Sequence, residues 1–582
     1  MSTNRRDLLK GAALSGVAAF GVAGCGRQSS NADPVADDVT NSNITTKTIA
    51  EAEKLQGVKF TPAERAMMIE GLEQNLEVLA TLRAIEMPND LAPALVFDPK
   101  LPRKRIGSQK NQLNIVGRYD ASLPDDDAEI AFASIAQQGT WLRQGALTAV
   151  RLTEIYLDRI RAHGDKLNCF ITVTEELARE QALKADADFA DGRDRGPLHG
   201  IPYGMKDLAD TKGILTSWGA TPFKDRVPDS DAEAVRKLQR AGAILLGKTS
   251  CGALAYGDQW FDARTRNPWN VQEGSSGSSA GSAAATASGL CGFSIGTETL
   301  GSIISPSERC GPTGLRPTFG RVSRAGFMAL SWSFDKIGPI CRSVEDTALV
   351  LSEINGFDAD DYGAARVGFT YEGTEDISGL TVGYVPAWFE EGDDVDRVAL
   401  DALRGLGVTL KEFSFPTTSF GSLIEIVLAE SAAAFADLTL SNEDDTLVWQ
   451  APGAWPNTFR QTRFLSAVDY VQIDRLRRKL MQEMSLAFEG FDALIGPHYA
   501  AGALLATNAT GHPQLALRAG YAQTPNRTQF GNGENDIEAA ETYRTPRSIS
   551  LWGDLFQEGK IISIGHALEK ELGVWRERPP GF

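Results

Sequence analysis

The chain has 582 residues, of which 42% are hydrophobic and 23% charged, so it can bury a sizeable core and global disorder is excluded. Its 76 acidic and 58 basic residues give a formal net charge of −18. This balance argues against nucleic acid as the main partner, because phosphate binding needs clustered Lys and Arg. Five histidines occur without metal-ligand spacing, which disfavours a zinc hydrolase.

The first 24 residues have the features of an export signal. Arg5 and Arg6 precede an uncharged run over 11–24, which is too short to span a bilayer and suits a cleavable signal. The paired arginines resemble a twin-arginine signal, and the four residues ending at Cys25 resemble a bacterial lipobox. The alternatives are an N-terminal anchor or a plain signal with an incidental cysteine. We expect an exported protein of the periplasm or cell envelope, lipid-anchored at Cys25, with residues 25–46 as a flexible tether.

Residues 47–127 are expected to form a helical extension followed by a linker. Thr61 and Glu64 make a capping box around a first-turn proline, which predicts a helix over 61–85. Prolines between 88 and 102 favour an extended linker after it. A stripe at helical spacing supports the helix: Leu72, Leu76 and Leu79. We expect the extension to wrap the main domain and to carry no chemistry.

From residue 128 onward helical and strand patterns alternate. Helices are predicted over 152–160, after a capping box at 230–233, over 343–351 and over 464–481, and strands over 169–173, 243–247 and 548–552. Such alternation predicts an α/β domain spanning 128–582, with a large mixed, mostly parallel central sheet covered by helices on both faces.

Five cysteines in this domain form no CxxC pair: Cys169, Cys251, Cys291, Cys310 and Cys341. Because their number is odd and their spacing irregular, they offer no disulfide framework. We expect them to be buried, reduced thiols that behave as small hydrophobic side chains.

The most unusual stretch is rich in glycine and serine and runs from Gly274 to Ser307. Composition alone would suggest a flexible linker. However, the run leads into an Ala-rich helix that ends near Gly289, then into a strand over 291–295, all within one domain. Upstream, Lys206 ends a short apolar strand, where a lone lysine would ordinarily be a solvated charge.

Taken together, these segments resemble the amidase signature family of serine hydrolases. The family's core reads approximately GGSSGGS and then GTDxGGSIRxPA, preceded by GIPxxxKD. This chain reads GIPYGMKD at 200–207, GSSGSSAGS at 274–282 and GTETLGSIISPS at 296–307. The order and spacing agree with the family. The close resemblance covers 129–355, with the signature core at about 196–345, and a looser match extends through Asn508 to Pro513.

The resemblance implies a carboxamide hydrolase that needs no cofactor and no metal. Ser302 would be the nucleophile, Ser278 the bridging serine that relays the proton, and Lys206 the base. A lysine with an ordinary pKa near 10.4 must be brought to about 7–8 for this role, so Lys206 should be buried. In the family the peptide bond before the bridging serine is cis, which corresponds here to Gly277 and Ser278.

The resemblance also implies an oxyanion hole made by the backbone N–H groups of Thr299, Leu300, Gly301 and Ser302. The chain departs from the family at four positions. Leu300 stands where many members have glycine, and Ile304 replaces a frequent arginine. Glu298 stands for the usual aspartate and Ala280 for a glycine. Since the triad is intact, these departures are expected to affect the substrate and not the chemistry.

Three functions remain open. The first is an exported amidase that cleaves a carboxamide to acid and amine through an acyl-serine intermediate. The second is an amidotransferase A-subunit-like protein, disfavoured by the export signal and the acidic chain. The third is a non-catalytic, membrane-tethered binding protein of the same fold. The expected partner is a small-molecule amide, with no nucleic acid, and a membrane only through the lipid anchor. Four aromatic residues are candidates for the pocket wall, although an aromatic side chain is more often packed in the core: Trp332, Phe334, Trp388 and Trp455.

Overall fold

The computed structural model describes residues 44–582 except 103, 105, 108, 117–118, 262, 501 and 528–540. The predicted export signal and Cys25 lie outside the described residues. The chain divides into two compact units, Met1–Glu86 and Met87–Phe582. Among the described helices, none combines the length and the apolar character needed to cross a membrane.

The first unit contains α1 (Thr46–Gln56) and α2 (Pro62–Arg83). The capping box predicted for α2 is present, since Glu64 N–H donates to Thr61 Oγ1 at 3.3 Å and Thr61 N–H donates to Glu64 Oε2 at 2.6 Å. The predicted helix is therefore confirmed. No residue of α2 is buried, so its leucine stripe is not a core face.

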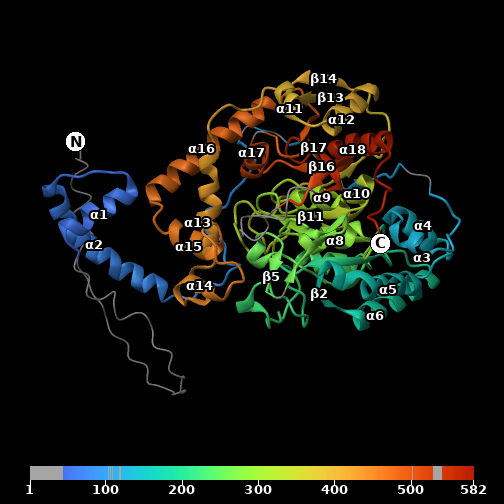
Figure 1. Ribbon diagram of the computed structural model, residues 1–582, viewed down its shortest axis with the longest axis horizontal. Helices are drawn as coiled ribbons and strands as arrows, with labels where there is room; N and C mark the ends of the chain where they lie inside the picture. The colour runs from blue at the N-terminus through green and yellow to red at the C-terminus, as the bar shows by residue number, and fades with distance from the viewer. Residues whose placement is uncertain are drawn as a thin grey trace, which may run out of the picture. The chain divides into compact units, whose positions relative to one another are not determined.

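The second unit is built on an eleven-stranded sheet, whose two edges are marked by β14 and β2 in Figure 1. From one edge to the other the strands are β14 (Thr409–Glu412), β13 (Thr381–Tyr384), β15 (Ala493–Pro497), β17 (Thr542–Trp552), β16 (Gln514–Pro525), β10 (Thr313–Arg316), β11 (Lys336–Cys341), β9 (Phe293–Glu298), β3 (Pro202–Lys206), β4 (Ile244–Thr249) and β2 (Phe170–Val173). Short pairs outside this sheet are β1 (Gln112–Leu113) with β12 (Thr370–Tyr371), β5 (Gln259–Trp260) with β6 (Ala263–Arg264), and β7 (Arg266–Asn267) with β8 (Asn270–Gly274).

The sheet is mixed, as expected, but the prediction that it is mostly parallel is wrong. Across the described strands four neighbouring pairs are parallel, namely β13–β14, β13–β15, β3–β4 and β3–β9. The other six pairs are antiparallel, including the long hairpin of β16 and β17. Continuous apolar runs are typical of parallel strands because these are buried on both faces, but β10 and β11 are equally buried and pair antiparallel, so such runs do not decide strand direction.

Helices flank the sheet, which confirms the predicted layered architecture. In chain order they are α3 (Asp127–Phe132), α4 (Ile135–Arg143), α5 (Ala149–Leu167), α6 (Glu175–Ala190), α7 (Glu233–Arg240), α8 (Ala280–Ala287), α9 (Ile304–Cys310), α10 (Val344–Ile354), α11 (Pro386–Glu391), α12 (Asp394–Gly405), α13 (Ile424–Ala434), α14 (Ala436–Leu440), α15 (Trp455–Thr462), α16 (Ala467–Ala487), α17 (Ala503–Thr510) and α18 (Glu558–Leu572). Figure 1 shows α11 and α12 near the β13–β14 edge and α5 and α6 near β2.

Two predicted helix starts have different outcomes. Ser343 caps α10 by accepting a hydrogen bond from the Asp346 N–H, as predicted. The capping box predicted over 230–233 is wrong, because the N-cap of α7 is Ala232 and no side chain caps it. The Glu233 carboxylate pairs instead with two arginines that follow it on α7, Arg236 and Arg240.

The five cysteines of the domain are free and buried, as predicted. Four of them belong to a core in which the sheet strands and their covering helices share one continuous set of buried side chains, whereas Cys251 belongs to a smaller apolar cluster. Burial raises the pKa of the Cys169 and Cys251 thiols. These thiols are therefore protonated packing groups at neutral pH.

Candidate active site

Lys206 is the last residue of β3, and its side chain is fully buried. Its Nζ donates hydrogen bonds to Ser278 Oγ at 2.8 Å, to Ser279 Oγ at 3.0 Å and to Thr297 Oγ1 at 2.8 Å. Burial lowers the pKa of Lys206 to about 7, although nearby acidic groups partly oppose this shift. A large fraction of this amine is therefore neutral at neutral pH, and the interpretation of a solvated strand-end charge is excluded.

The glycine- and serine-rich run is not a flexible linker. It follows β8 and enters α8, and Ser278 is only 1% exposed. The peptide bond between Gly277 and Ser278 is cis. A Cβ atom added at Gly277 would lie 1.8 Å from the Gly257 carbonyl oxygen, so only glycine fits this close backbone approach.

Ser302 lies in the turn between β9 and α9 and is 8% exposed. Its backbone carbonyl accepts a hydrogen bond from the Ser279 N–H at 3.0 Å, which keeps the two serine segments adjacent. In the described part of the chain, no hydrogen bond joins the Ser278 and Ser302 hydroxyls. The structure thus brings Lys206 and Ser278 into contact and places Ser302 beside them through the backbone.

The turn before α9 presents the backbone groups predicted for an oxyanion hole. Within the described structure, none of the N–H groups of residues 299–302 donates a hydrogen bond to protein. Gly301 has a φ of 90°, and a Cβ added there would lie 3.2 Å from Leu504. Leu300 is half-buried, while Ile304 is fully buried. The four N–H groups are therefore available to an oxyanion.

Glu298 holds this turn in place, a role that the sequence motifs do not reveal. Its Oε2 accepts hydrogen bonds from the N–H groups of Ile303 and Ile304 at 3.0 Å each. Its Oε1 accepts from Arg316 Nη1 at 2.9 Å and from Asn508 Nδ2 at 3.0 Å. Burial would raise the pKa of Glu298, but Arg316, Asn508 and Lys336 together outweigh it and lower this pKa to about 2. The only sequence signals were the GTE triplet and the loosely matched stretch that begins at Asn508.

A cavity of about 330 Å³ reaches Thr297 and Thr299, next to the lysine. Of the aromatic residues considered as pocket walls, Trp332 lines this cavity. Trp388 lines a separate cavity of about 310 Å³. Phe334 belongs to the main core and Trp455 to a smaller apolar cluster, so both are packing residues. The cavity wall is mixed, because charged residues such as Asp335, Lys336 and Arg324 line it together with apolar ones: Leu208, Phe327, Met328 and Leu330.

The described part of the α/β sheet presents a buried lysine of lowered pKa, serine hydroxyls and a turn whose N–H groups are free. These are the groups that a hydrolase needs for acyl transfer. The Amidase family profile matches residues 151–562, and the chain belongs to the amidase family.

Two kinds of relative support this assignment. The A subunit of glutamyl-tRNA(Gln) amidotransferase from Roseiflexus sp. (strain RS-1) is 34% identical, covering 75% of this chain and 96% of the relative, and its counterpart from Desulfatibacillum aliphaticivorans is 32% identical, covering 77% and 98%. The solved structure of native peptide amidase from Stenotrophomonas maltophilia matches with a TM-score of 0.66 at 28% identity, covering 77% of this chain and 98% of that one. The chain is therefore an amide-hydrolysing enzyme with the amidase signature fold. This assignment disfavours the hypothesis of a non-catalytic binding protein.

Proposed function

We propose that this enzyme hydrolyses a carboxamide C–N bond through an acyl intermediate on Ser302. The observation that carries the proposal is the 2.8 Å contact between Ser278 Oγ and Lys206 Nζ, made by a fully buried amine whose pKa is about 7. Such an amine can accept a proton at neutral pH, and a hydroxyl in contact with it can relay one.

The proposed reaction uses these three side chains. Ser302 Oγ attacks the carbonyl carbon while its proton passes to Ser278 Oγ, whose own proton passes to Lys206 Nζ. The N–H groups of residues 299–302 bind the oxyanion. The C–N bond then breaks as Ser278 protonates the leaving amine and regains a proton from Lys206. Water, activated by the same relay, cleaves the acyl ester to give the acid. Substrate binding brings the Ser302 and Ser278 hydroxyls into hydrogen-bond contact.

A fluorophosphonate probe tests the assignment of the nucleophile. The wild-type enzyme is expected to be labelled once per chain and to hydrolyse members of a panel of peptide, aryl and fatty-acid amides. Ser302→Ala should abolish labelling, and Lys206→Ala should lower kcat/KM about 10²- to 10⁴-fold, the usual contribution of a general base. Labelling of Ser302→Ala at the wild-type rate would refute the proposal.

A second candidate is an amidotransferase A-subunit-like function, which the curated relatives favour by name. The likeness to peptide amidase and the predicted export signal support a free-standing amidase instead. Assaying the purified chain alone separates the two candidates. A free-standing amidase releases amine from simple amides unaided, whereas an A-subunit-like protein is inactive until glutamyl-tRNA(Gln) and partner subunits are supplied.

We also propose that the enzyme is exported and anchored through a lipid on Cys25. The support is the sequence alone: an arginine pair, a short apolar run and the lipobox-like residues before Cys25. Cell fractionation tests it. The wild-type enzyme is expected in the membrane fraction of the envelope, and Cys25→Ala should release it from the membrane. Recovery of both proteins in the cytosol would contradict the proposal.

A further inference from the structure

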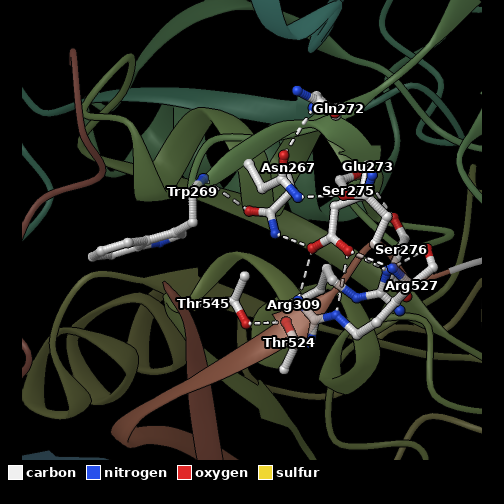
Figure 2. Close-up of polar contacts among 12 residues, drawn as sticks. Asn267, Trp269, Gln272, Glu273, Ser275, Ser276, Arg309, Thr524, Arg527 and Thr545 are labelled. Carbon is white, nitrogen blue, oxygen red and sulfur yellow. Dashed lines mark hydrogen bonds and ion pairs between the residues drawn. The ribbon is translucent and has the colours of Figure 1, made fainter. Parts of the chain in front are cut away.

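A buried ionic cluster lies beside the segment that carries Ser278 (Figure 2). Its centre is Glu273 of β8, whose side chain is 1% exposed. The carboxylate accepts hydrogen bonds from Asn267 Nδ2 at 2.7 Å, from the Arg527 N–H at 2.9 Å and from Arg527 Nη2 at 2.8 Å. Arg309 Nη1 lies 3.7 Å from it. Burial would raise the pKa of Glu273, but the guanidinium groups outweigh it and lower this pKa.

The cluster spans the two segments that carry the serines. Glu273 lies five residues before Ser278, and Arg309 lies on α9, seven residues after Ser302. A helix rises about 1.5 Å per residue, so Arg309, five residues after the first residue of α9, lies roughly 7–8 Å along the helix from the turn that carries Ser302. The ion pair between Glu273 and Arg309 therefore joins β8 to α9.

Neighbouring contacts tie the same two segments together. Ser276 Oγ donates to Ser305 Oγ at 3.1 Å, and Cys310 Sγ donates to the Ser275 carbonyl at 3.5 Å. The Trp269 indole donates to the Cys310 carbonyl at 2.8 Å. These contacts are single hydrogen bonds between neutral groups, each worth about 1 kcal/mol net. The ion pair of Glu273 with Arg309 at 3.7 Å adds a charged contact to this interface, in a buried position where salt screens charges little.

The charge on Glu273 matters because two cations depend on it. Arg309 Nε and Arg527 Nη1 are buried and have no hydrogen-bond partner within the described residues. Glu308 is 3.6 Å from Arg527 but also pairs with Arg547 at 3.2 Å. Without the Glu273 charge, Arg309 and Arg527 would lose the carboxylate that both contact, and the repulsion between them would weaken the packing of α9 against β8.

We propose that Glu273 is a positioning residue for the amidase reaction. Its carboxylate holds α9 against β8 through Arg309, and this contact sets the distance between the Ser302 and Ser278 hydroxyls. The inference rests on the proposed function, since it assigns those two hydroxyls to one proton path. Glu273 touches neither serine side chain and acts only through the two segments.

The test variant is Glu273→Gln, which keeps the size of the side chain and an acceptor for Asn267 but removes the charge. We expect kcat for an amide substrate to fall at least tenfold while KM changes less than twofold. The rate of fluorophosphonate labelling should fall in parallel, with a final stoichiometry of one per chain. The pH at half-maximal kcat/KM should not move, because Lys206 is untouched. The matched control is Glu577→Gln, which removes a carboxylate from the exposed pair with Arg544 and should behave as wild type.

Arg309→Met provides an independent variant, because it removes the α9 side of the same contact. It should show the same selective loss of kcat, and the double variant should lose no more than either single one. Wild-type kcat in Glu273→Gln or Arg309→Met would overturn the inference. So would a loss of labelled sites at an unchanged labelling rate, which indicates partial unfolding. Labelling of Ser302→Ala would instead refute the proposed function, so the two failures are distinguishable.

Discussion

At the scale of single residues, the decisive feature is the cost of burying Lys206. A lysine out of contact with water holds its proton weakly, and three hydroxyls around its Nζ offer no negative charge to compensate. Burial of Lys206 therefore lowers the stability of the folded enzyme, and it also provides a base that works at neutral pH. This balance leads to two predictions about pH.

The first prediction concerns activity. Lys206 must be neutral to accept a proton, and its pKa is about 7. We therefore expect kcat/KM to fall tenfold per pH unit below about pH 7 and to level off above it. Steady-state rates on a neutral amide between pH 5 and 9 measure this profile. An activity that stays constant from pH 5 to 8 would contradict the assignment of Lys206 as the base.

The second prediction concerns stability. The pKa of Lys206 is about 7 in the folded enzyme and about 10.4 in an unfolded chain. Between these values only the unfolded chain holds the proton, so the free energy of unfolding rises with pH there. Below about pH 7 both states hold the proton. The folded enzyme is then less stable, by on the order of 4–5 kcal/mol, than it would be if Lys206 had an ordinary pKa. We expect the Tm of Lys206→Met relative to wild type to increase as pH falls from 10 to 7 and then to stay constant.

Thermal melts at several pH values test this difference. The hydrogen bonds lost in Lys206→Met shift its Tm by a similar amount at every pH, so only the change with pH carries information. Ser302→Ala serves as the control, because the side chain of residue 302 does not bond to Lys206. Its Tm should change with pH in the same way as that of wild type. Parallel curves for Lys206→Met as well would show that Lys206 keeps an ordinary pKa in the folded enzyme.

At the scale of elements, the site depends on how the start of α9 is fixed. Glu298, at the end of β9, binds the first N–H groups of α9, and Arg316 of β10 and Asn508 of α17 hold its other oxygen. Arg316 also donates to the His512 carbonyl at 2.8 Å. Two strands and two helices therefore meet at one buried carboxylate.

We predict that Glu298→Gln destabilises the enzyme by about 3–5 kcal/mol, because it leaves Arg316 as an unpaired charge in a fully buried position. Denaturant unfolding measures the change. The double variant Glu298→Gln/Arg316→Met should recover part of the loss, since it removes the orphaned cation. Glu375→Gln, in an exposed pair with Lys570, should change stability by less than about 1 kcal/mol. Equal effects of the two single variants would contradict the argument.

How far the sequence predicts these elements depends on the distance over which each contact acts. The motifs located Lys206 and Ser278, because their residue types and spacing are local signals. The helix and strand positions followed from periodicity. The partners of Glu298 lie 18 and 210 residues away, and no pattern in one sequence joins them. Strand direction was missed for a similar reason, because pairing is decided by neighbours that are remote in the chain.

At the scale of the whole molecule, the boundary between the two compact units differs from the one that periodicity indicates. Residues 47–127 were expected to form one extension, but residues 87–127 belong with the enzyme unit. Asn89 Nδ2 donates to the Ala329 carbonyl at 2.9 Å, and the Ala329 N–H donates back at 2.7 Å. Farther on, Val116 N–H donates to Glu345, which is nearly fully buried. Proline-rich composition predicted an extended segment but not the surface on which it packs.

This division predicts opposite outcomes for two truncations. A variant that begins at Met87 should keep a Tm within about 2 °C of wild type and its full kcat/KM, because the second unit is complete. A variant that begins at Ala128 removes the β1–β12 pair and the Asn89 contacts next to the wall of the 330 Å³ cavity. It should therefore melt at a clearly lower temperature and show a raised KM. Thermal melts and amide kinetics on both variants test these two expectations. If the two truncations behave alike, residues 87–127 are not an integral part of the enzyme unit.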